Sequence, residues 1–177
     1  RTSTLQMTAS SSLGFTADRT MRSAQNLYEA GLITYLRTDG INISTSPNTG
    51  EPFSEENPGP PPLEEIRNVI SEKFGKKFLS DDVRVYKSKV KNSQEAHEAI
   101  RPTNIKTYPE KINLGQDEQK LYTLIWNRTV ASQMSNSEHE RKKIVVHSEN
   151  DKFVLNASSR KTIFEGFETL SKKDSSE

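Results

Sequence analysis

Apolar residues recur at intervals of three and four through the first 30 positions, and this spacing predicts two consecutive helices. The first covers residues 2–14 and ends at Gly14, and the second begins at Thr16 and is closed by Gly31. Their expected buried residues are Leu5, Ala9 and Leu13, then Met21, Ala24, Leu27 and Tyr28. The run 32–36 has strand character. Helix, turn, helix and strand is the order of a winged-helix or helix-turn-helix unit, although other small helical subdomains share it.

Residues 44–62 hold six of the eight prolines and two of the eight glycines, which predicts a surface loop without regular structure. Helical spacing returns over 63–74, where Gly75 ends the pattern. Alternation at 83–85 predicts a short strand, and residues 93–101 predict a short helix that stops before Pro102.

The longest helical pattern covers residues 117–134, with Tyr122, Ile125, Trp126, Thr129 and Val130 on its buried face. The period then changes. KKIVVHS and KFVLNAS predict two strands joined by a turn at 149–151, and Ile163, Phe164 and Phe167 suggest one more strand.

The predicted fold class is therefore α+β. A mainly helical, winged-helix-like domain covers 1–135 and includes the proline-rich loop at 44–62. A small antiparallel β segment follows over 136–170, and a disordered tail is expected at 171–177.

Composition narrows the function without defining it. The 25 basic and 24 acidic residues give a net charge of +1, so any contact with nucleic acid must depend on local cations. Cysteine is absent, which excludes disulfides and thiolate metal sites. No apolar run is long enough to predict a membrane span or a signal peptide. The hydrophobic share of 31% predicts a modest core, as in a piece of a longer protein.

The segment GLITYLRTDG, residues 31–40, contains a candidate nucleophile. If it is extended, Tyr35, Arg37 and Asp39 point to the same side. A free phenol ionises at a pKa of about 10. A neighbouring guanidinium favours the phenolate and can hold a phosphate through two parallel hydrogen bonds. This combination suits attack of a tyrosine on a phosphodiester. Taken alone, it is more often structural: a half-buried strand tyrosine beside an Arg37–Asp39 ion pair.

A second segment, QEAHEAIRPT at 94–103, places His97 and Arg101 four residues apart. On a helix they share a face, and both can donate hydrogen bonds to a phosphate. The structural alternative is a surface helix on which Arg101 pairs with Glu98 or Glu95.

Four stretches together resemble the bacterial type IA DNA topoisomerases, in the same order along the chain. They are TSTLQ (2–6), GFTADRTMRSAQNLYEAGLITYLRTDG (14–40), KNSQEAHEAIRPT (91–103) and LYTLIWNRTVASQM (121–134). The signatures around ITYLRTD and AHEAIRP are the most specific, and the match covers most of the chain outside the proline-rich segment and the tail.

The resemblance implies an enzyme that cuts one DNA strand through a 5′-phosphotyrosine, passes another strand through the gap and reseals it without ATP. Tyr35 matches the nucleophile, Arg37 the phosphate-binding arginine and His97 the active-site histidine. Three further matches are expected near DNA: Asp39, Gln25 and Arg101. The implied partner is DNA, single-stranded at the cleavage site, and the implied protein is a monomer of the bacterial cytoplasm and nucleoid or of a bacteria-derived organelle.

In this family Mg²⁺ is held by a Toprim domain on the N-terminal side of the tyrosine. No such acidic cluster is evident here: Asp81–Asp82 and Glu55–Glu56 are interpreted as solvated charges, and His97, His139 and His147 lack a shared ligand spacing. No metal site is expected in this chain. Residues 136–170 would form part of a β-rich hinge domain, and the chain alone would be inactive.

Three alternatives belong to other classes. A non-catalytic winged-helix DNA-binding module explains the opening order of elements but leaves Tyr35, Arg37 and His97 without a role. Tyrosine recombinases have the nucleophile after their His and Arg residues, and paired-histidine relaxases need two neighbouring histidines, so neither order fits. A purely structural or interaction fragment is the third.

Overall fold

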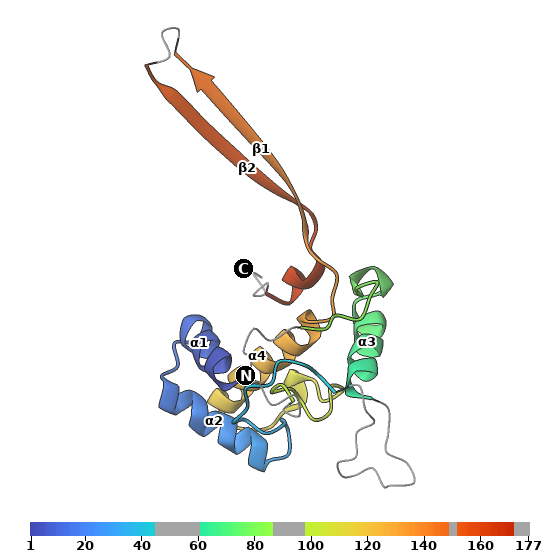
Figure 1. Ribbon diagram of the computed structural model, residues 1–177. Coiled ribbons are helices and arrows are strands. Elements are labelled where there is room, and N and C mark those ends of the chain that lie inside the picture. The colour runs from blue at the N-terminus through green and yellow to red at the C-terminus, as the bar shows by residue number, and fades with distance from the viewer. Residues whose placement is uncertain (45–60, 87–97, 149–151, 172–177) are drawn as a thin grey trace.

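The structure is a computed structural model that describes residues 1–44, 61–86, 98–148 and 152–171. Four α-helices form a body from which a two-stranded hairpin projects (Figure 1). The helices are α1 (Thr2–Leu13), α2 (Ala17–Glu29), α3 (Pro62–Lys73) and α4 (Gln116–Ala131), and the strands are β1 (Glu138–His147) and β2 (Val154–Phe164). Helices together with an antiparallel sheet confirm the α+β class.

The first two helices follow the sequence prediction closely. Gly14 takes the left-handed conformation at φ 68° and ends α1. The Thr16 hydroxyl then caps α2 by accepting a hydrogen bond from the Arg19 N–H at 3.2 Å. The core side chains of these helices are Leu5 and Ala9 in α1 and Thr20, Ser23, Ala24 and Leu27 in α2. The burial predicted for Tyr28 is wrong: its side chain is 40% exposed in the last turn of α2.

Helix α4 packs against α1, α2 and α3 and supplies the largest buried side chains of the body. All five residues predicted for its inner face are buried: Tyr122, Ile125, Trp126, Thr129 and Val130. The Tyr122 hydroxyl donates to the Thr107 carbonyl at 2.7 Å, and the Trp126 indole N–H donates to the Ile105 carbonyl at 2.9 Å. Burial raises the pKa of Tyr122 well above its ordinary value.

The predicted helix after the proline-rich segment is confirmed as α3, with Leu63, Ile66, Val69 and Ile70 buried. It begins at Pro62, where the fixed φ of proline suits a first helical turn and the missing N–H removes no intrahelical bond. Most of the predicted proline-rich loop, residues 45–60, lies outside the described residues, as do the predicted turn at 149–151 and the tail from 172.

Strands β1 and β2 confirm the two predicted strands and pair antiparallel from Glu138 opposite Phe164 to His147 opposite Val154. The hairpin stands clear of the helical body (Figure 1), and most of its side chains are exposed. The suggestion of a third strand is wrong. Ile163 and Phe164 end β2, and Phe167 lies in the 3₁₀ helix η3 (Gly166–Ser171). Gly166 permits this turn, because its φ is 50° and a side chain there would collide with the Asn136 backbone.

Polar side chains gather where the hairpin meets the body. His139 Nε2 lies 3.1 Å from the Ser137 hydroxyl and 3.2 Å from a Glu168 carboxylate oxygen, and it also contacts the Arg160 guanidinium. Arg160 reaches the same Glu168 oxygen at 3.2 Å. Desolvation favours a higher pKa for Glu168, but hydrogen bonds from Ser137 and His139 and the charges of His139 and Arg160 outweigh it, so this pKa lies below its ordinary value.

Two short predicted elements are wrong, and a third lies mostly outside the described residues. Residues 32–36 form only one isolated bridge, between Ile33 and Pro102, and residues 83–85 form no strand. The helix predicted over 93–101 is absent from its described part, since residues 98–101 are not helical. Proline lacks the N–H that would continue a ladder, and threonine side chains supply competing hydrogen bonds to nearby backbone. Among the described helices, none is long and apolar enough to cross a membrane.

Candidate functional site

The candidate nucleophile lies on an irregular segment that we call the tyrosine segment, residues 31–44. Its side chains alternate between the core and the surface although it is not a strand. Ile33 and Leu36 are 1% and 2% exposed, whereas Tyr35 is 54% exposed. Arg37 and Asp39 are exposed as well. The residues that carry the phenol, the guanidinium and the carboxylate are therefore all exposed, and buried Leu36 fixes the segment to the core between Tyr35 and Arg37.

Thr2, at the start of α1, holds this segment from one side. The Thr2 N–H donates to the Thr38 carbonyl at 3.0 Å, and the Thr38 N–H donates to the Thr2 hydroxyl at 3.0 Å. The Thr2 hydroxyl in turn donates to the Leu36 carbonyl at 2.7 Å. These bonds fix the backbone on both sides of Arg37. The TSTLQ stretch thus anchors the candidate site directly.

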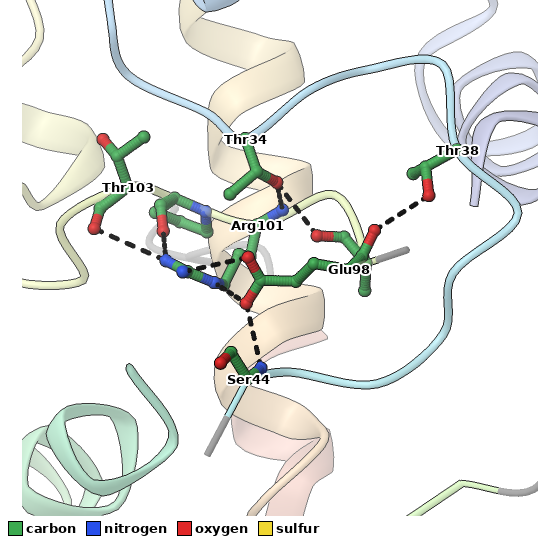
Figure 2. Close-up of polar contacts among 8 residues, drawn as sticks. Thr34, Thr38, Ser44, Glu98, Arg101 and Thr103 are labelled. Carbon is green, nitrogen blue, oxygen red and sulfur yellow. Dashed lines mark hydrogen bonds and ion pairs between the residues drawn. The ribbon is translucent and has the colours of Figure 1, made fainter. Parts of the chain in front are cut away.

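A second stretch, residues 98–103, runs alongside the tyrosine segment, and we call it the arginine segment (Figure 2). The Thr34 N–H donates to the Arg101 carbonyl at 2.9 Å, and the Arg101 N–H donates to the Thr34 hydroxyl at 3.0 Å. The Thr34 hydroxyl also donates to the Ala99 carbonyl at 2.9 Å, and the Thr38 hydroxyl donates to the Glu98 carbonyl at 2.9 Å. The fold thus joins the two signatures that the sequence separates by about sixty positions.

Arg101, expected near DNA, is instead buried at 4% exposure. Its Nε lies 2.7 Å from one Glu98 carboxylate oxygen and its Nη2 lies 3.2 Å from the other. Its Nη1 donates to the Pro102 carbonyl at 2.8 Å. The pairing with Glu98 is the structural alternative foreseen from the sequence, but it occurs in a buried, non-helical stretch rather than on a surface helix. His97 lies outside the described residues.

Helix α2 places Tyr28 against the tyrosine segment and also carries Gln25. The rings of Tyr28 and Tyr35 meet edge to face, with centroids 5.5 Å apart and planes at 68°. Gln25 is half-buried, and its side-chain amide donates to Glu29 at 2.7 Å. Sequence reasoning missed Tyr28 as a site residue because helical periodicity assigned it to the core. It also missed the anchoring role of Thr2, Thr34 and Thr38. The available signal was that threonines recur within and beside the signature stretches.

The described residues contain no group of three His, Asp or Glu side chains that could hold a metal ion. The site offers a phenol, a guanidinium and a carboxylate at the surface, on backbone held in place by partly buried hydrogen bonds. Such an arrangement can present a phenol for attack with a cation two residues away.

Comparison with known proteins identifies the family to which the chain belongs. A family model described as DNA topoisomerase matches residues 1–177, and the chain belongs to that family. The resemblance inferred from the two signatures is confirmed.

Individual relatives give the same result. The chain is 43% identical to DNA topoisomerase 1 of Rickettsia bellii over 94% of its own length and 20% of the relative. It is 44% identical to DNA topoisomerase 1 of Helicobacter pylori, over 94% of this chain and 22% of that protein. The solved structure of full-length topoisomerase I from Thermotoga maritima superposes with a TM-score of 0.75 at 36% identity, covering 98% of this chain and 26% of that one. The chain thus spans about a fifth of the length of its curated relatives.

Proposed function

We propose that this chain is the tyrosine-bearing part of a type IA DNA topoisomerase and that Tyr35 is the residue that cuts DNA. The observation that supports this most directly is the 54% exposure of Tyr35 on a segment whose flanking residues are buried or hydrogen-bonded. The complete protein would relax supercoiled DNA by cutting one strand, passing another through the gap and resealing it without ATP.

In the proposed reaction the Tyr35 phenol oxygen attacks a backbone phosphorus. A bond forms between this oxygen and phosphorus, the bond from phosphorus to O3′ breaks, and the proton lost by the phenol is balanced by one gained at O3′. The product is a 5′-phosphotyrosine and a free 3′-hydroxyl. Resealing is the reverse, with O3′ attacking and the tyrosine leaving, so the bond energy is retained throughout.

Arg37 is proposed to hold the non-bridging phosphate oxygens. Its guanidinium can donate two parallel hydrogen bonds and stabilises the negative charge that grows during attack. His97 is proposed as a second donor on the basis of the AHEAIRP signature alone. Asp39 and Gln25 are proposed to lie near DNA, which the exposure of Asp39 permits. We do not extend this role to Arg101, because its guanidinium is buried against Glu98.

The remaining parts of the proposal concern the longer protein. We propose a winged-helix-like tyrosine domain over 1–135 and part of a β-rich hinge over 136–170. The exposed apolar side chains of the hairpin, such as Ile144 at 62% and Leu155 at 70%, suit a surface that the rest of the protein covers. Mg²⁺ would be held by a Toprim domain outside this chain. The described residues contain no group of three His, Asp or Glu side chains that could hold it.

The proposed partner is DNA that is single-stranded at the cleavage site, bound by a monomer associated with the nucleoid. Two cations that could contact the DNA backbone, Arg22 on α2 and Arg37 on the tyrosine segment, are exposed. Local contacts of this kind predict binding that weakens as salt rises.

The test is Tyr35→Phe in the full-length enzyme. This change removes one exposed hydroxyl and keeps the ring, so the fold and most of the DNA affinity should remain while the covalent adduct disappears. Tyr86→Phe is the matched control, because Tyr86 is also an exposed tyrosine, at 41%. Adducts are read on a denaturing gel with an oligonucleotide labelled at its 3′ end, the end that stays with the enzyme. A persistent adduct in Tyr35→Phe would show that another residue is the nucleophile and would favour the non-catalytic DNA-binding alternative for this segment.

A further inference from the structure

We propose that Arg101 and Glu98 form a positioning clamp for the tyrosine segment, an inference that rests on the proposed role of Tyr35. Arg101 and Glu98 are not assigned a contact with DNA. They hold residues 98–101 in the irregular conformation to which the tyrosine segment is bonded, and so determine where the Tyr35 phenol and the Arg37 guanidinium are presented.

The tie points lie at the start, middle and end of the tyrosine segment. At its start Thr34 exchanges hydrogen bonds with the Arg101 backbone. In its middle the Thr38 hydroxyl donates to the Glu98 carbonyl at 2.9 Å. At its end the Ser44 N–H donates to a Glu98 carboxylate oxygen at 2.9 Å, and the Asn42 carbonyl accepts the Ala99 N–H at 2.9 Å. Tyr35, Arg37 and Asp39 therefore all lie between points that are bonded to the four-residue stretch 98–101, through Glu98, Ala99 and Arg101.

The side chains of the pair keep these four residues in place (Figure 2). The Arg101 guanidinium bridges the Glu98 carboxylate on one side and the Pro102 carbonyl on the other. The oxygen of Glu98 that receives Arg101 Nε at 2.7 Å also receives the Ser44 N–H. One carboxylate thus joins the arginine segment to the end of the tyrosine segment. Loss of the Glu98 side chain removes the bonds to both Arg101 and Ser44, and loss of the Arg101 side chain removes the donors that hold the Glu98 carboxylate in place.

The contribution of the Arg101–Glu98 pair to the free energy of unfolding explains its presence poorly, because burying the pair carries a desolvation cost. The Arg101 side chain is 5% exposed and that of Glu98 is 28% exposed, so forming the pair removes most of a charge from water. Buried ion pairs often contribute little or nothing net to stability compared with apolar side chains of the same volume. A rigid bidentate contact does fix relative position, and placement errors of about 1 Å in a reacting group can lower a rate roughly 10²-fold.

The test compares Arg101→Met, Arg101→Lys and Glu98→Gln in the full-length enzyme. Adduct formation is followed in single turnover at saturating DNA, and DNA affinity and melting temperature are measured for each variant. Arg101→Met should slow adduct formation by about 10- to 10²-fold while affinity stays within about threefold. Arg101→Lys and Glu98→Gln should have intermediate rates, because each retains only part of the fork of hydrogen bonds.

Arg67→Met is the matched control. The half-buried Arg67 guanidinium, on α3, donates to the Ser80 hydroxyl at 3.1 Å and the Ser80 carbonyl at 2.9 Å, and neither the tyrosine nor the arginine segment supplies these contacts. This variant should lose stability but cleave at the wild-type rate well below its melting temperature.

The clamp is supported if the Arg101 and Glu98 variants form the adduct more slowly while their DNA affinity is unchanged, and if Arg67→Met forms it at the wild-type rate. It is overturned if Arg101→Met cleaves like the wild type, or if its loss of rate follows only the fraction of folded protein. If Arg101→Met does not fold, the proposal is tested with Arg101→Lys and Glu98→Gln. Wild-type rates of adduct formation in both of these variants would overturn the clamp. Tyr35→Phe, assayed in parallel, separates the two proposals: an adduct there refutes the nucleophile, whatever the clamp variants do.

Discussion

The contact between Tyr28 and Tyr35 predicts a measurable effect on DNA cleavage. The two rings meet edge to face at 5.5 Å, and both are substantially exposed, at 40% and 54%. An aromatic pair of this geometry contributes about 0.5–1.5 kcal/mol beyond the area that it buries. If the contact holds the Tyr35 ring in its attacking orientation, Tyr28→Ala lowers the rate of adduct formation by the corresponding factor, about 2- to 12-fold.

Tyr28→Phe isolates the cause. It keeps the ring and the edge-to-face contact and removes only the hydroxyl, so we expect a rate close to that of the wild type. Both variants are assayed in the full-length enzyme, under single-turnover conditions, with a 3′-labelled oligonucleotide at saturating concentration. Because Tyr28 is exposed, Tyr28→Ala should leave the core of α2 and the melting temperature nearly unchanged.

A control of the same residue type strengthens the comparison. Tyr86 has nearly the same exposure, 41%, but its hydroxyl donates to the Ser132 carbonyl at 2.8 Å. Because this hydroxyl contact is with α4's C-cap residue Ser132 and not with Tyr35, Tyr86→Ala should cleave at the wild-type rate. Equal rates for Tyr28→Ala and the wild type, or an equally slow Tyr28→Phe, would refute orientation of Tyr35 through this ring contact.

Two further predictions concern charge. Arg37→Ala should slow adduct formation about 10²- to 10³-fold, the usual loss when one preorganised donor is removed. Arg37→Lys should recover only part of this rate, because an ammonium group lacks the planar fork of a guanidinium. A wild-type rate in Arg37→Ala would rule out the phosphate-binding role of Arg37. The pKa of Glu168 is depressed in the folded protein, so its contribution to stability is present above the unfolded pKa of about 4.3 and is lost as pH falls through the lower folded value. Protection factors against hydrogen exchange across residues 136–170 of the full-length enzyme, corrected for the intrinsic pH dependence of exchange, should therefore fall toward acid pH, and Glu168→Gln should reduce that dependence; an unchanged pH profile in Glu168→Gln would contradict this.

The helices could be predicted because their determinants are local. In α4 the residues at helical spacing are the buried ones, and in α2 the Thr16 cap forms as expected. The strands of the hairpin were predictable for the same reason, since alternation and a turn lie within one short stretch. Tyr28 shows the limit of periodicity: the helical pattern places it on the inner face, but its ring packs against Tyr35 and remains exposed.

Elements whose backbone is bonded to distant residues could not be predicted. The stretch 32–36 has the apolar character of a strand, but its partner is an irregular stretch, and the bridge between them in the described residues falls on Pro102. Thr34 and Thr38 supply the remaining connections with their side chains. Nothing in the local sequence around Thr34 indicates that its partner lies 65 residues away.

The candidate site was predicted in part, and the reason given for one feature was wrong. Tyr35, Arg37 and Asp39 are all exposed, as expected of alternate strand positions, but no strand is present. Burial of Leu36 and the bonds of Thr2 and Thr38 impose the alternation. For Arg101, charge spacing identified Glu98 as a possible partner but could not show burial, because that depends on contacts with the remote tyrosine segment.

These contacts explain how an irregular segment can present a nucleophile reproducibly. Regular elements are usually the more accurate support for a reactive group, since each residue is fixed by its ladder or helix. Here side chains replace the ladder: threonine hydroxyls bond to backbone on both sides of Tyr35, and one buried ion pair holds the stretch that receives them. Such a design leaves the phenol and guanidinium exposed while the neighbouring backbone groups of Thr34, Leu36 and Thr38 are hydrogen-bonded. It also makes accuracy depend on a few polar side chains, so substitutions at Thr34, Glu98 or Arg101 should affect cleavage more than their modest share of the core would suggest.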